Sequence, residues 1–233
     1  MFYIDYINDK KILRSDLLKD VEHFFTTRDL CIFSKEEDFS HNKDIVEKFV
    51  SQKLATNKPI HGVNIKKVNN NDFIYENCDG LIFEQGTAGF MNFGDCVPLL
   101  FYCNGVALIS HAGWRGSVRE IAKISVNKLV EFYKFNKNDI KVVIGPAICK
   151  NCYEVGEDVF YKLYNTVKNH DDIFIKNSGK FFVDLKGINK QQLLEEGIKN
   201  IDVCPYCTNC GEKMFYSYRY ENTACRHSLI VKV

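Results

Sequence analysis

The stretch GDCVPLLFYCNGVALISHAGWRG, residues 94–116, decides how this chain folds. Two apolar runs flank Asn104-Gly105, the pair that most strongly favours a two-residue type I′ hairpin because both positions accept positive φ. This turn fixes the register of the hairpin and places Pro98 opposite His111. The stretch therefore predicts two paired strands that the rest of the chain is built around.

Cys96 and His111 are the first candidates for a functional site. The register places them one diagonal step apart on the same face of the hairpin, at roughly 7–8 Å with side chains that reach toward each other. This spacing suits one metal ion, whose bonds to thiolate and imidazole run about 2.3 and 2.0 Å. Taken alone, Cys96 would be interpreted as a small buried hydrophobe, so the prediction depends on the hairpin geometry.

His61 and Asp95 complete this candidate site. A catalytic zinc ion takes three protein ligands and keeps one position open for water or substrate, and His61 is the natural third ligand. A lone histidine near the start of a strand is also a common structural residue. Asp95, next to Cys96, could hydrogen-bond a ligating histidine and orient it. We therefore predict His61, Cys96 and His111 as metal ligands, and Cys96, His111 and Asp95 as catalytic residues.

Length and composition indicate a single globular domain over residues 1–233, with 45% hydrophobic residues. The 31 lysine and arginine residues are balanced by 30 acidic ones, so no broad basic field attracts nucleic acid. The N-terminus lacks the features of a signal peptide, and no apolar stretch approaches the ~18 residues of a membrane span. We expect a cytoplasmic protein that binds neither nucleic acid nor membrane and whose ten cysteines stay reduced.

Strands outnumber helices in the predicted secondary structure. Besides the hairpin, strands are expected at residues 2–7, 21–28, 60–68, 78–84, 141–146, 181–185, 214–219 and 227–233. Helices are expected at residues 44–55, 117–135, 153–167 and 188–198, the second opened by a capping box of Ser117 and Glu120, and residues 34–43 are expected to form a loop. Several strands are joined by tight turns, which favours an α+β fold with mixed β-sheets and flanking helices.

The junction HAGWRG, residues 111–116, connects the hairpin to the next helix. Its two glycines allow a tight turn, and the free N–H groups of the helix start, beside Arg115, offer a site for an anion. Trp114 either lines this site or fills the core. Arg28, Arg219 and Arg226 end or follow predicted strands, where a side chain can point into a cleft. We predict Arg28, Trp114, Arg115 and Arg219 as substrate-binding residues.

Cys204, Cys207 and Cys210 follow one another at spacings found in iron–sulfur and zinc sites. The fourth cysteine of the ferredoxin spacing is missing. A fourth ligand would have to come from elsewhere in the chain, from Cys149, Cys152 or Cys225. The alternative is a loop with reduced thiols and no metal, and the sequence leaves this choice open.

Several short motifs follow one another in a recognisable order along nearly the whole chain. The most specific are D-C-V-P at residues 95–98 and H-A-G-W-R-G at 111–116. The others are H-x-F-x-T-R at 23–28, His61-Gly62, D-G-L at 79–81, G-P-x-I and C-Y-E-V within 145–155, V-D-L at 183–185 and F-x-S-Y-R at 215–219. Together they resemble the purine nucleoside phosphorylase family once called multicopper polyphenol oxidases, or laccase-domain proteins.

This resemblance implies a zinc site made of His61, Cys96 and His111. It implies phosphate-dependent cleavage of adenosine, inosine or guanosine to the free base and ribose 1-phosphate. Adenosine deamination and methylthioadenosine phosphorolysis are implied as related activities. It also implies an α+β fold akin to a group of cysteine hydrolases. Arginines would then hold phosphate near the sugar C1′, where positive charge develops.

Three other functions compete with this hypothesis. Cys96 and His111 could be the nucleophile and base of an amidase that edits cell-wall precursors. A copper oxidase needs a blue-copper centre and a trinuclear cluster, which the six histidines cannot both supply. A redox-responsive binding module could be built on the cysteine-rich loop. Loss of nucleoside turnover in Cys96→Ala, with retention in Cys207→Ala, would argue against the binding module.

Overall fold

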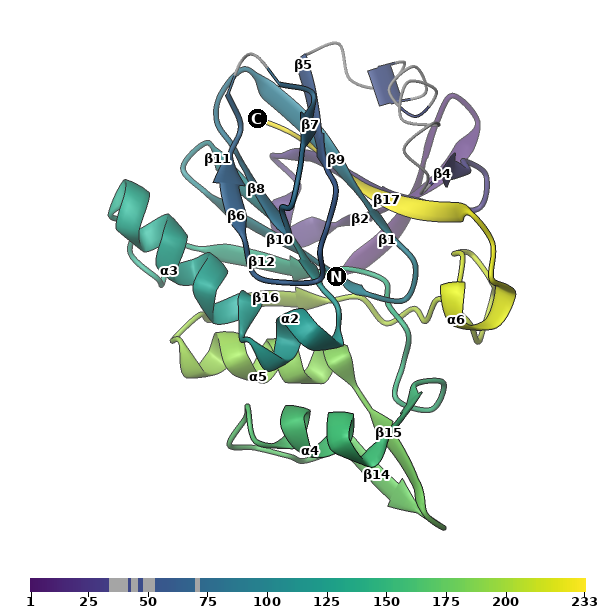
Figure 1. Ribbon diagram of the computed structural model, residues 1–233. Helices are drawn as coiled ribbons and strands as arrows, with labels where there is room; N and C mark the ends of the chain where they lie inside the picture. The colour runs from purple at the N-terminus through teal and green to yellow at the C-terminus, as the bar shows by residue number, and fades with distance from the viewer. Residues whose placement is uncertain (34–41, 43–45, 48–52, 70–71) are drawn as a thin grey trace.

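The computed structural model describes residues 1–33, 42, 46–47, 53–69 and 72–233. Its strands form two large sheets that pack against each other, and helices cover the outer face of one of them (Figure 1). A small third sheet with one helix extends from this body at the lower end of Figure 1. The architecture confirms the predicted α+β class with mixed sheets.

The first sheet contains strands from both ends of the chain. Its order is β1 (Phe2–Ile7), β2 (Lys10–Ser15), β3 (Glu22–Thr26), β17 (Cys225–Lys232), β9 (Thr87–Phe93), β5 (Lys53–Asn57) and β7 (Ile74–Tyr75), with β4 (Ile32–Phe33) paired to β17. A 3₁₀ turn, Asp16–Leu18, follows β2. β5 runs parallel to β7 and β9, whereas β17 is antiparallel to its neighbours. The last strand of the chain therefore lies in the middle of this sheet.

The second sheet has the predicted hairpin at its centre. Its order is β16 (Asn200–Val203), β12 (Lys141–Ile144), β10 (Val97–Cys103), β11 (Val106–Ala112), β8 (Gly80–Phe83) and β6 (Ile65–Lys67). The outer pairs, β12 with β16 and β6 with β8, are parallel, and the inner pairs are antiparallel. The small sheet has the order β13 (Glu154–Val155), β15 (Lys180–Val183) and β14 (Phe174–Asn177).

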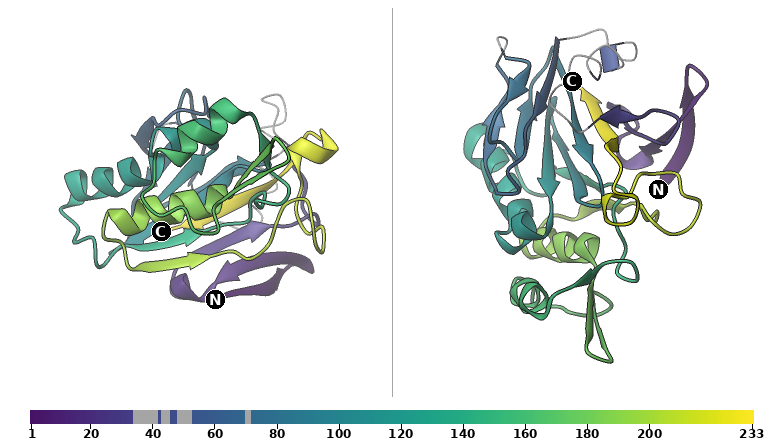
Figure 2. Two further views of the ribbon diagram at one scale, coloured as in Figure 1. Left: turned by 90° about the horizontal axis from the view of Figure 1, so that it is seen from below. Right: turned by 45° about the vertical axis from the view of Figure 1, so that its right-hand side comes forward.

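Helices cover the face of the second sheet that points away from the first. They are α2 (Trp114–Val118), α3 (Ile121–Tyr133) and α5 (Leu185–Glu195), which gather on one side of the strands in both views of Figure 2. α4 (Glu157–Tyr164) packs on the small sheet through β15. α6 (Tyr218–Glu221) is a single short turn in the connection that leads to β17. This connection lies beside the end of the hairpin at which Asp95 accepts a hydrogen bond from the backbone N–H of Arg219.

The hairpin has the predicted register. Pro98 pairs with His111, and the turn residues Asn104 and Gly105 have φ values of 45° and 81°. Both strands are buried almost throughout, because helices cover one face and the first sheet covers the other. This double burial explains why the strands are continuous apolar runs rather than alternating ones.

Side chains of the hairpin alternate between two cores. Leu99 and Phe101 belong to the core beneath the helices, whereas Leu100 and Ile109 belong to the core between the sheets. A slip of one residue would exchange these two sets of side chains. Each fully buried Leu, Ile or Phe contributes about 1.5–3 kcal/mol, so the register that fits both cores is strongly favoured.

The predicted helix at residues 44–55 is partly wrong. Its residues 44–45 and 48–52, and residues 34–41 and 43 of the predicted loop, lie outside the described residues. Val46 and Glu47 are helical, but positions 53–55 begin strand β5. Leu54 and Ala55 point into different cores, because neighbouring side chains of a strand lie on opposite faces. In the sequence, these two apolar residues look like the last residues of an amphipathic helix, which explains the wrong prediction.

The predicted helix at residues 117–135 is two helices, and its capping box is wrong. α2 already begins at Trp114, so Ser117 lies inside it and its hydroxyl accepts a hydrogen bond from an asparagine of α5. Glu120 adopts a left-handed conformation, with φ of 58°, between α2 and α3. Phe132, near the C-terminal end of α3, is 49% exposed. The tight turn after β11 leads directly into a helix, and this makes a cap three residues later unnecessary.

Two predicted strands are also corrected. Residues 214–219 lead into α6, where the Ser217 hydroxyl accepts from the backbone N–H of Tyr220 and the Glu221 carboxylate accepts from the N–H of Ser217. This local cap outweighs the strand preference of the aromatic residues before it. The strand expected at residues 60–68 is confined to β6, because its first half is a loop. β9 is a strand that the sequence pattern did not indicate.

Candidate metal and substrate site

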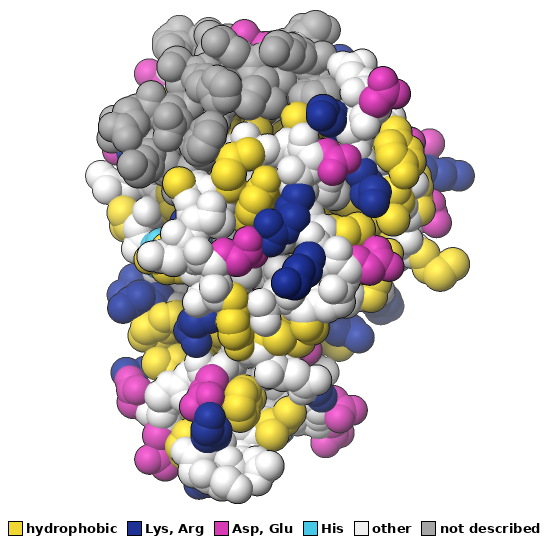
Figure 3. Space-filling view, turned by 90° about the vertical axis from the view of Figure 1, so that its right-hand side faces the viewer, with side chains coloured by type: hydrophobic (Ala, Val, Ile, Leu, Met, Phe, Trp, Pro, Cys, Tyr) yellow, Lys and Arg dark blue, Asp and Glu magenta, His cyan; other side chains and the backbone are white. Residues whose placement is uncertain are grey.

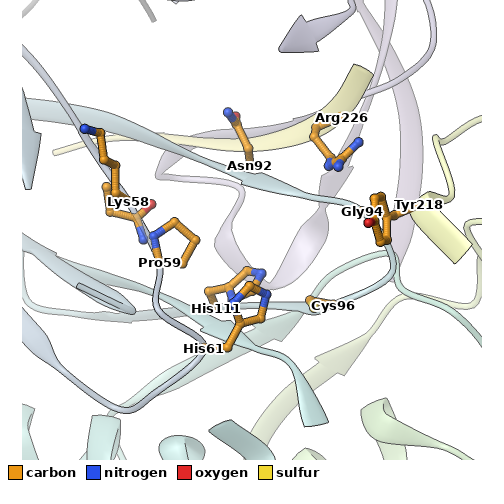
Figure 4. Close-up of a pocket in the computed structure, with 10 residues that line it drawn as sticks. Lys58, Pro59, His61, Asn92, Gly94, Cys96, His111, Tyr218 and Arg226 are labelled. Carbon is orange, nitrogen blue, oxygen red and sulfur yellow. The ribbon is translucent and has the colours of Figure 1, made fainter. Parts of the chain in front are cut away.

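His61, Cys96 and His111 come together at one end of the hairpin (Figure 4). Their ligand atoms all lie within 4.8 Å of one another, and the two imidazole ring centres are 5.0 Å apart. In Figure 4 the two histidine rings lie next to each other, with Cys96 to one side of them. The structure thus brings together the three residues that were predicted as metal ligands.

The hairpin positions two of these residues. His111 lies in β11 opposite Pro98, and Cys96 comes two residues before Pro98, just outside β10. The backbone N–H of His111 also donates to the carbonyl oxygen of Asp79 at 2.8 Å. The spacing of Cys96 and His111 is therefore set by backbone hydrogen bonding within a rigid sheet, as a precise site requires.

His61 is held by a loop that a buried carboxylate braces. Its backbone is left-handed, with φ of 57°, which costs a non-glycine residue about 1–2 kcal/mol. The carboxylate of Asp79 is fully buried and accepts hydrogen bonds from the N–H groups of Ile60 and Asn64, at 3.0 and 3.4 Å. These two bonds flank His61 in the chain. The D-G-L motif at residues 79–81 is the signal in the sequence that points to this role.

Gly113 leaves space for the three candidate ligands. A Cβ atom at this position would lie 3.0 Å from the Sγ of Cys96, 3.3 Å from the Cδ2 of His61 and 3.9 Å from the Cε1 of His111. The backbone at Gly113 has φ of −73° and ψ of 175°, which any residue can adopt. Glycine is therefore required at this position by the limited space next to the candidate ligands, and not by the backbone conformation.

Desolvation shifts the pKa of all three side chains, although only His111 is buried and His61 is exposed. Desolvation lowers the pKa of His111 to about 3 and also lowers the pKa of His61. Desolvation raises the pKa of the Cys96 thiol to about 12. Both imidazoles are therefore neutral near pH 7 and have a lone pair to offer. Cys96 becomes a thiolate only if a positive charge binds beside it.

These side chains fit a zinc ion. The Nδ1 atom of His111 is buried and has no hydrogen-bond partner among the described residues. A buried nitrogen without a partner costs about 1–3 kcal/mol, and a bond to a metal ion would remove that cost. Two imidazoles and one thiolate are donors that zinc prefers, and three protein ligands leave a fourth position open.

Asp95 does not orient a histidine, contrary to the expectation. Its two carboxylate oxygens accept hydrogen bonds from the Thr208 hydroxyl at 2.6 Å and from the backbone N–H of Arg219 at 2.7 Å. Its carbonyl oxygen accepts from the N–H of Ile148 at 3.1 Å. Asp95 therefore braces the loops around Cys96, and a direct catalytic role for it stays a prediction.

The three candidate ligands line a cavity of about 540 Å³, a volume suited to a small molecule. The other lining residues are Asn57, Lys58, Pro59, Asn92, Gly94, Tyr218 and Arg226. In Figure 4, Asn92 and Arg226 extend from β9 and β17 on the side of the cavity opposite the two histidines. Both sheets thus contribute to its walls.

Arg226 is a cavity residue that was not among the predicted substrate-binding residues. Its half-buried guanidinium lies over the ring of Tyr218, at 5.1 Å from the ring centre, and donates to the carbonyl oxygens of Thr223 and Cys225. Within the described part of the chain, no carboxylate forms an ion pair with it. Its position at the start of the last strand was the only signal in the sequence, and several other arginines share such a position.

The predicted substrate-binding residues lie in different places. Trp114 and Arg219 line a second cavity of about 580 Å³. Arg115 lies over the ring of Trp114, at 4.4 Å from the ring centre. Arg28 forms an ion pair with Glu221 of α6. None of these four predicted residues lines the cavity that contains His61, so their substrate contacts stay predictions.

The cysteines differ from expectation in two ways. Cys31 and Cys225 form a disulfide, so the expectation that all ten cysteines stay reduced is wrong, and Cys225 is not available as a fourth ligand. Cys204 is buried between the sheets, because it directly follows β16. Cys207 and Cys210 instead form a cluster with Cys149 and Cys152.

The surface in Figure 3 carries charges of both signs. Basic and acidic side chains are interspersed on this face, and neither sign forms a continuous field. Among the described residues, no helix is both long enough and apolar enough to cross a membrane.

Two packed sheets that bring two imidazoles and a thiol to the wall of a small-molecule cavity define a candidate metalloenzyme. The model of the family described as multi-copper polyphenol oxidoreductase laccase matches residues 26–232 of this chain. The chain therefore belongs to that family, and the resemblance seen in its motifs is confirmed.

Curated relatives carry two different enzyme names. The chain is 34% identical to the purine nucleoside phosphorylase YlmD of Geobacillus stearothermophilus over 176 residues, which cover 69% of this chain and 64% of the relative. It is 34% identical over 151 residues to the adenosine deaminase RL5 of an unknown prokaryotic organism, covering 62% of this chain and 57% of the relative. These matches span less than two thirds of the relatives' own lengths.

Solved structures match the whole chain more fully. The crystal structure of YlmD from Geobacillus stearothermophilus superposes with a TM-score of 0.88 at 25% identity and covers 98% of both chains. The hypothetical protein YfiH from Bacillus licheniformis also gives a TM-score of 0.88, at 26% identity, and covers 99% of both chains. The fold of this chain is thus the fold of those proteins.

Proposed function

We propose that this protein is a zinc-dependent purine nucleoside phosphorylase. It would cleave adenosine, inosine or guanosine with phosphate and release the purine base and ribose 1-phosphate. Adenosine deamination and methylthioadenosine phosphorolysis are proposed as related activities of the same site. The observation that carries the proposal is a cavity of about 540 Å³ with His61, Cys96 and His111 on one side and Arg226 on the other. The names of the curated relatives support the choice of substrate.

His61, Cys96 and His111 would hold the zinc ion. When bound, zinc would supply a Lewis acid and a means to lower the pKa of a bound water to about 7. The neutral imidazoles can bind it without first losing a proton, whereas Cys96 loses one on binding. The loop brace of Asp79 and the open space at Gly113 keep the three donors in place.

Arg226 would bind the phosphate. Its guanidinium is permanently charged, faces the cavity and has no carboxylate partner among the residues described. A half-buried cation of this kind gains free energy when an anion with several acceptor oxygens reaches it. In the reaction, a phosphate oxygen forms a bond to C1′ of the ribose while the electron pair of the glycosidic bond leaves with the base. Arg226 would hold that oxygen close to C1′.

Tyr218 would bind the purine. Its ring lines the cavity, is 56% exposed and is already supported on one side by the guanidinium of Arg226. An exposed aromatic ring in a cavity offers a flat apolar surface on which a purine can stack. The amide side chains of Asn57 and Asn92 also line the cavity and supply polar groups that can select a substrate.

The test is to incubate the purified protein with inosine, adenosine and methylthioadenosine, each with and without phosphate, and to identify the products. We expect free base and ribose 1-phosphate only when phosphate is present, and inosine from adenosine if deamination also occurs. No change in any nucleoside would overturn the proposal. A trapped acyl-enzyme on Cys96 would instead support the amidase alternative.

A matched pair of variants locates the phosphate. Arg226→Met should raise the KM for phosphate at least about tenfold, because the lost charge-assisted contacts contribute roughly 1.5–3 kcal/mol. Arg219→Met changes an arginine of the second cavity in the same way and should leave that KM within about twofold. The opposite result would move the phosphate site to the second cavity and restore the predicted role of Arg219.

A further inference from the structure

Four cysteines from two distant parts of the sequence meet in one cluster. They occur as two C-x-x-C pairs, Cys149 with Cys152 and Cys207 with Cys210. Their sulfur atoms all lie within 4.8 Å of one another. Paired C-x-x-C motifs are a common framework for a metal ion with four thiolate ligands. The cluster does not line the cavity that contains His61.

We propose that Cys149, Cys152, Cys207 and Cys210 bind one structural zinc ion. The sulfur separations fit a single ion, because bonds of about 2.3 Å in a tetrahedron place the sulfurs ~3.8 Å apart. The Sγ atoms of Cys149 and Cys210 are 3.7 Å apart. A disulfide between them would need about 2.05 Å, so the arrangement is that of ligands rather than of a bonded pair.

Backbone and amide N–H groups donate to two of the four sulfurs. The Sγ of Cys207 accepts from the backbone N–H groups of Cys149 and Asn209, at 3.3 and 3.4 Å. The Sγ of Cys152 accepts from the side-chain amide of Asn209 at 3.4 Å. Donors of this kind stabilise the negative charge of thiolates, which a four-cysteine metal site must carry. The sulfurs of Cys152 and Cys207 therefore have donors that favour the thiolate form.

The proposed ion would join two loops that shape the first site. One loop follows β12 and the other follows β16, and they meet in a bridge between Ala147 and Cys207. Thr208, next to Cys207, donates to the Asp95 carboxylate. The carbonyl oxygen of Cys152 accepts from the hydroxyl of Tyr220 in α6 at 2.8 Å. Four protein ligands leave no open position, which is typical of a structural zinc site and not of a catalytic one.

The first test measures metal bound to the purified full chain, with two variants. The double variant Cys149→Ser/Cys210→Ser removes one ligand from each pair and should contain about one zinc ion per chain less than the unchanged protein. Cys204→Ala changes the neighbouring cysteine outside the cluster and should keep its zinc. Equal zinc in the double variant and the unchanged protein would overturn the proposal, as would iron in place of zinc.

A second test does not depend on the folding of a variant. The unchanged protein is loaded with Co²⁺, which should give the strong sulfur-to-cobalt charge-transfer bands of a tetrahedral four-thiolate site. A site with one thiolate and two imidazoles gives much weaker bands of this kind, so the His61 site cannot imitate the result. Loading without four-thiolate bands would overturn the proposal.

Discussion

The two sulfur-containing clusters of this protein are built in opposite ways. The cluster of His61, Cys96 and His111 takes two members from one hairpin, has three donors and opens onto a cavity. The cluster of four cysteines takes its members from loops, has four donors and does not line that cavity. Rigid strands place donors accurately for chemistry, whereas a metal bound by loops holds the loops themselves together. The first arrangement suits reaction and the second suits stability.

One carboxylate connects the two clusters. Asp95 precedes Cys96 in the chain, and its side chain accepts the hydrogen bond of Thr208, which follows Cys207. The loops of the cysteine cluster therefore support the segment that carries one of the three candidate ligands.

The largest effect on activity is expected from Cys96→Ala. This change removes a candidate ligand, and because loss of a supporting partner alone costs 10–100-fold, turnover of inosine should fall at least about 100-fold. The Tm should change by less than about 5 °C, since the thiol fills little volume in the core. Steady-state kinetics and thermal melting measure both quantities. A variant that keeps full turnover would contradict a catalytic role for this cluster.

The change Asp79→Ala should weaken both zinc binding at His61 and the fold. It leaves the N–H groups of Ile60 and Asn64 without their acceptor, so we expect a loss of about 1–3 kcal/mol in the free energy of unfolding. Zinc affinity should fall about 10–100-fold. Asp79→Asn keeps one carbonyl oxygen and should give an intermediate result. Unchanged zinc affinity in Asp79→Ala, measured by competition with a chelator, would show that the loop does not need this brace.

Gly113→Ala should reduce zinc affinity with little effect on stability. The added Cβ would lie 3.0 Å from the Sγ of Cys96, so the donors must shift by a few tenths of an ångström. We expect roughly a tenfold loss of zinc affinity. Gly156→Ala is the matched control, because Gly156 precedes a helix with nearly the same backbone angles and its Cβ would meet only the flexible Asp158 side chain. Equal zinc affinities of the two variants would contradict the spacing role of Gly113.

The smallest effect on activity is expected from Thr208→Val, which breaks the connection between the clusters. The hydroxyl bond to the Asp95 carboxylate should contribute about 1.5–3 kcal/mol, and its loss should lower the Tm by roughly 5 °C. Turnover should fall only a few-fold, and the zinc content should not change. A fall in turnover as large as that of Cys96→Ala would mean that Asp95 takes part in the reaction directly.

Much of the first cluster could be predicted from the sequence. The pair Asn104-Gly105 fixes a tight turn, and the turn fixes the register that brings Cys96 beside His111. These relations are local. Side chains along a strand alternate between the two faces of a sheet, so the turn alone decides which residues of the two strands lie on the same face. The α+β class and the membership of the family were predictable for a similar reason, since they depend on patterns that can be read along the chain.

The wall of the cavity that lies opposite the histidines could not be predicted in the same way. Arg226 reaches it because β17 pairs with β9 in the first sheet and packs across from the hairpin, a pairing of segments more than a hundred residues apart. The sequence pattern favoured Arg28 and Arg219 equally, and the structure gives them other partners. Pairing between distant strands depends on how two whole sheets fit together, which no short motif encodes.

The sequence by itself determined the hairpin, its register and the chemical type of the first cluster, because all three follow from adjacent residues and backbone geometry. Only the tertiary structure decided which cysteines meet, that Cys204 faces the core and that Cys31 pairs with Cys225. Two C-x-x-C pairs are visible in the sequence, but the 54 residues between Cys152 and Cys207 allow many arrangements. Packing of β12 beside β16 selects one of them and places the loops that follow those strands together.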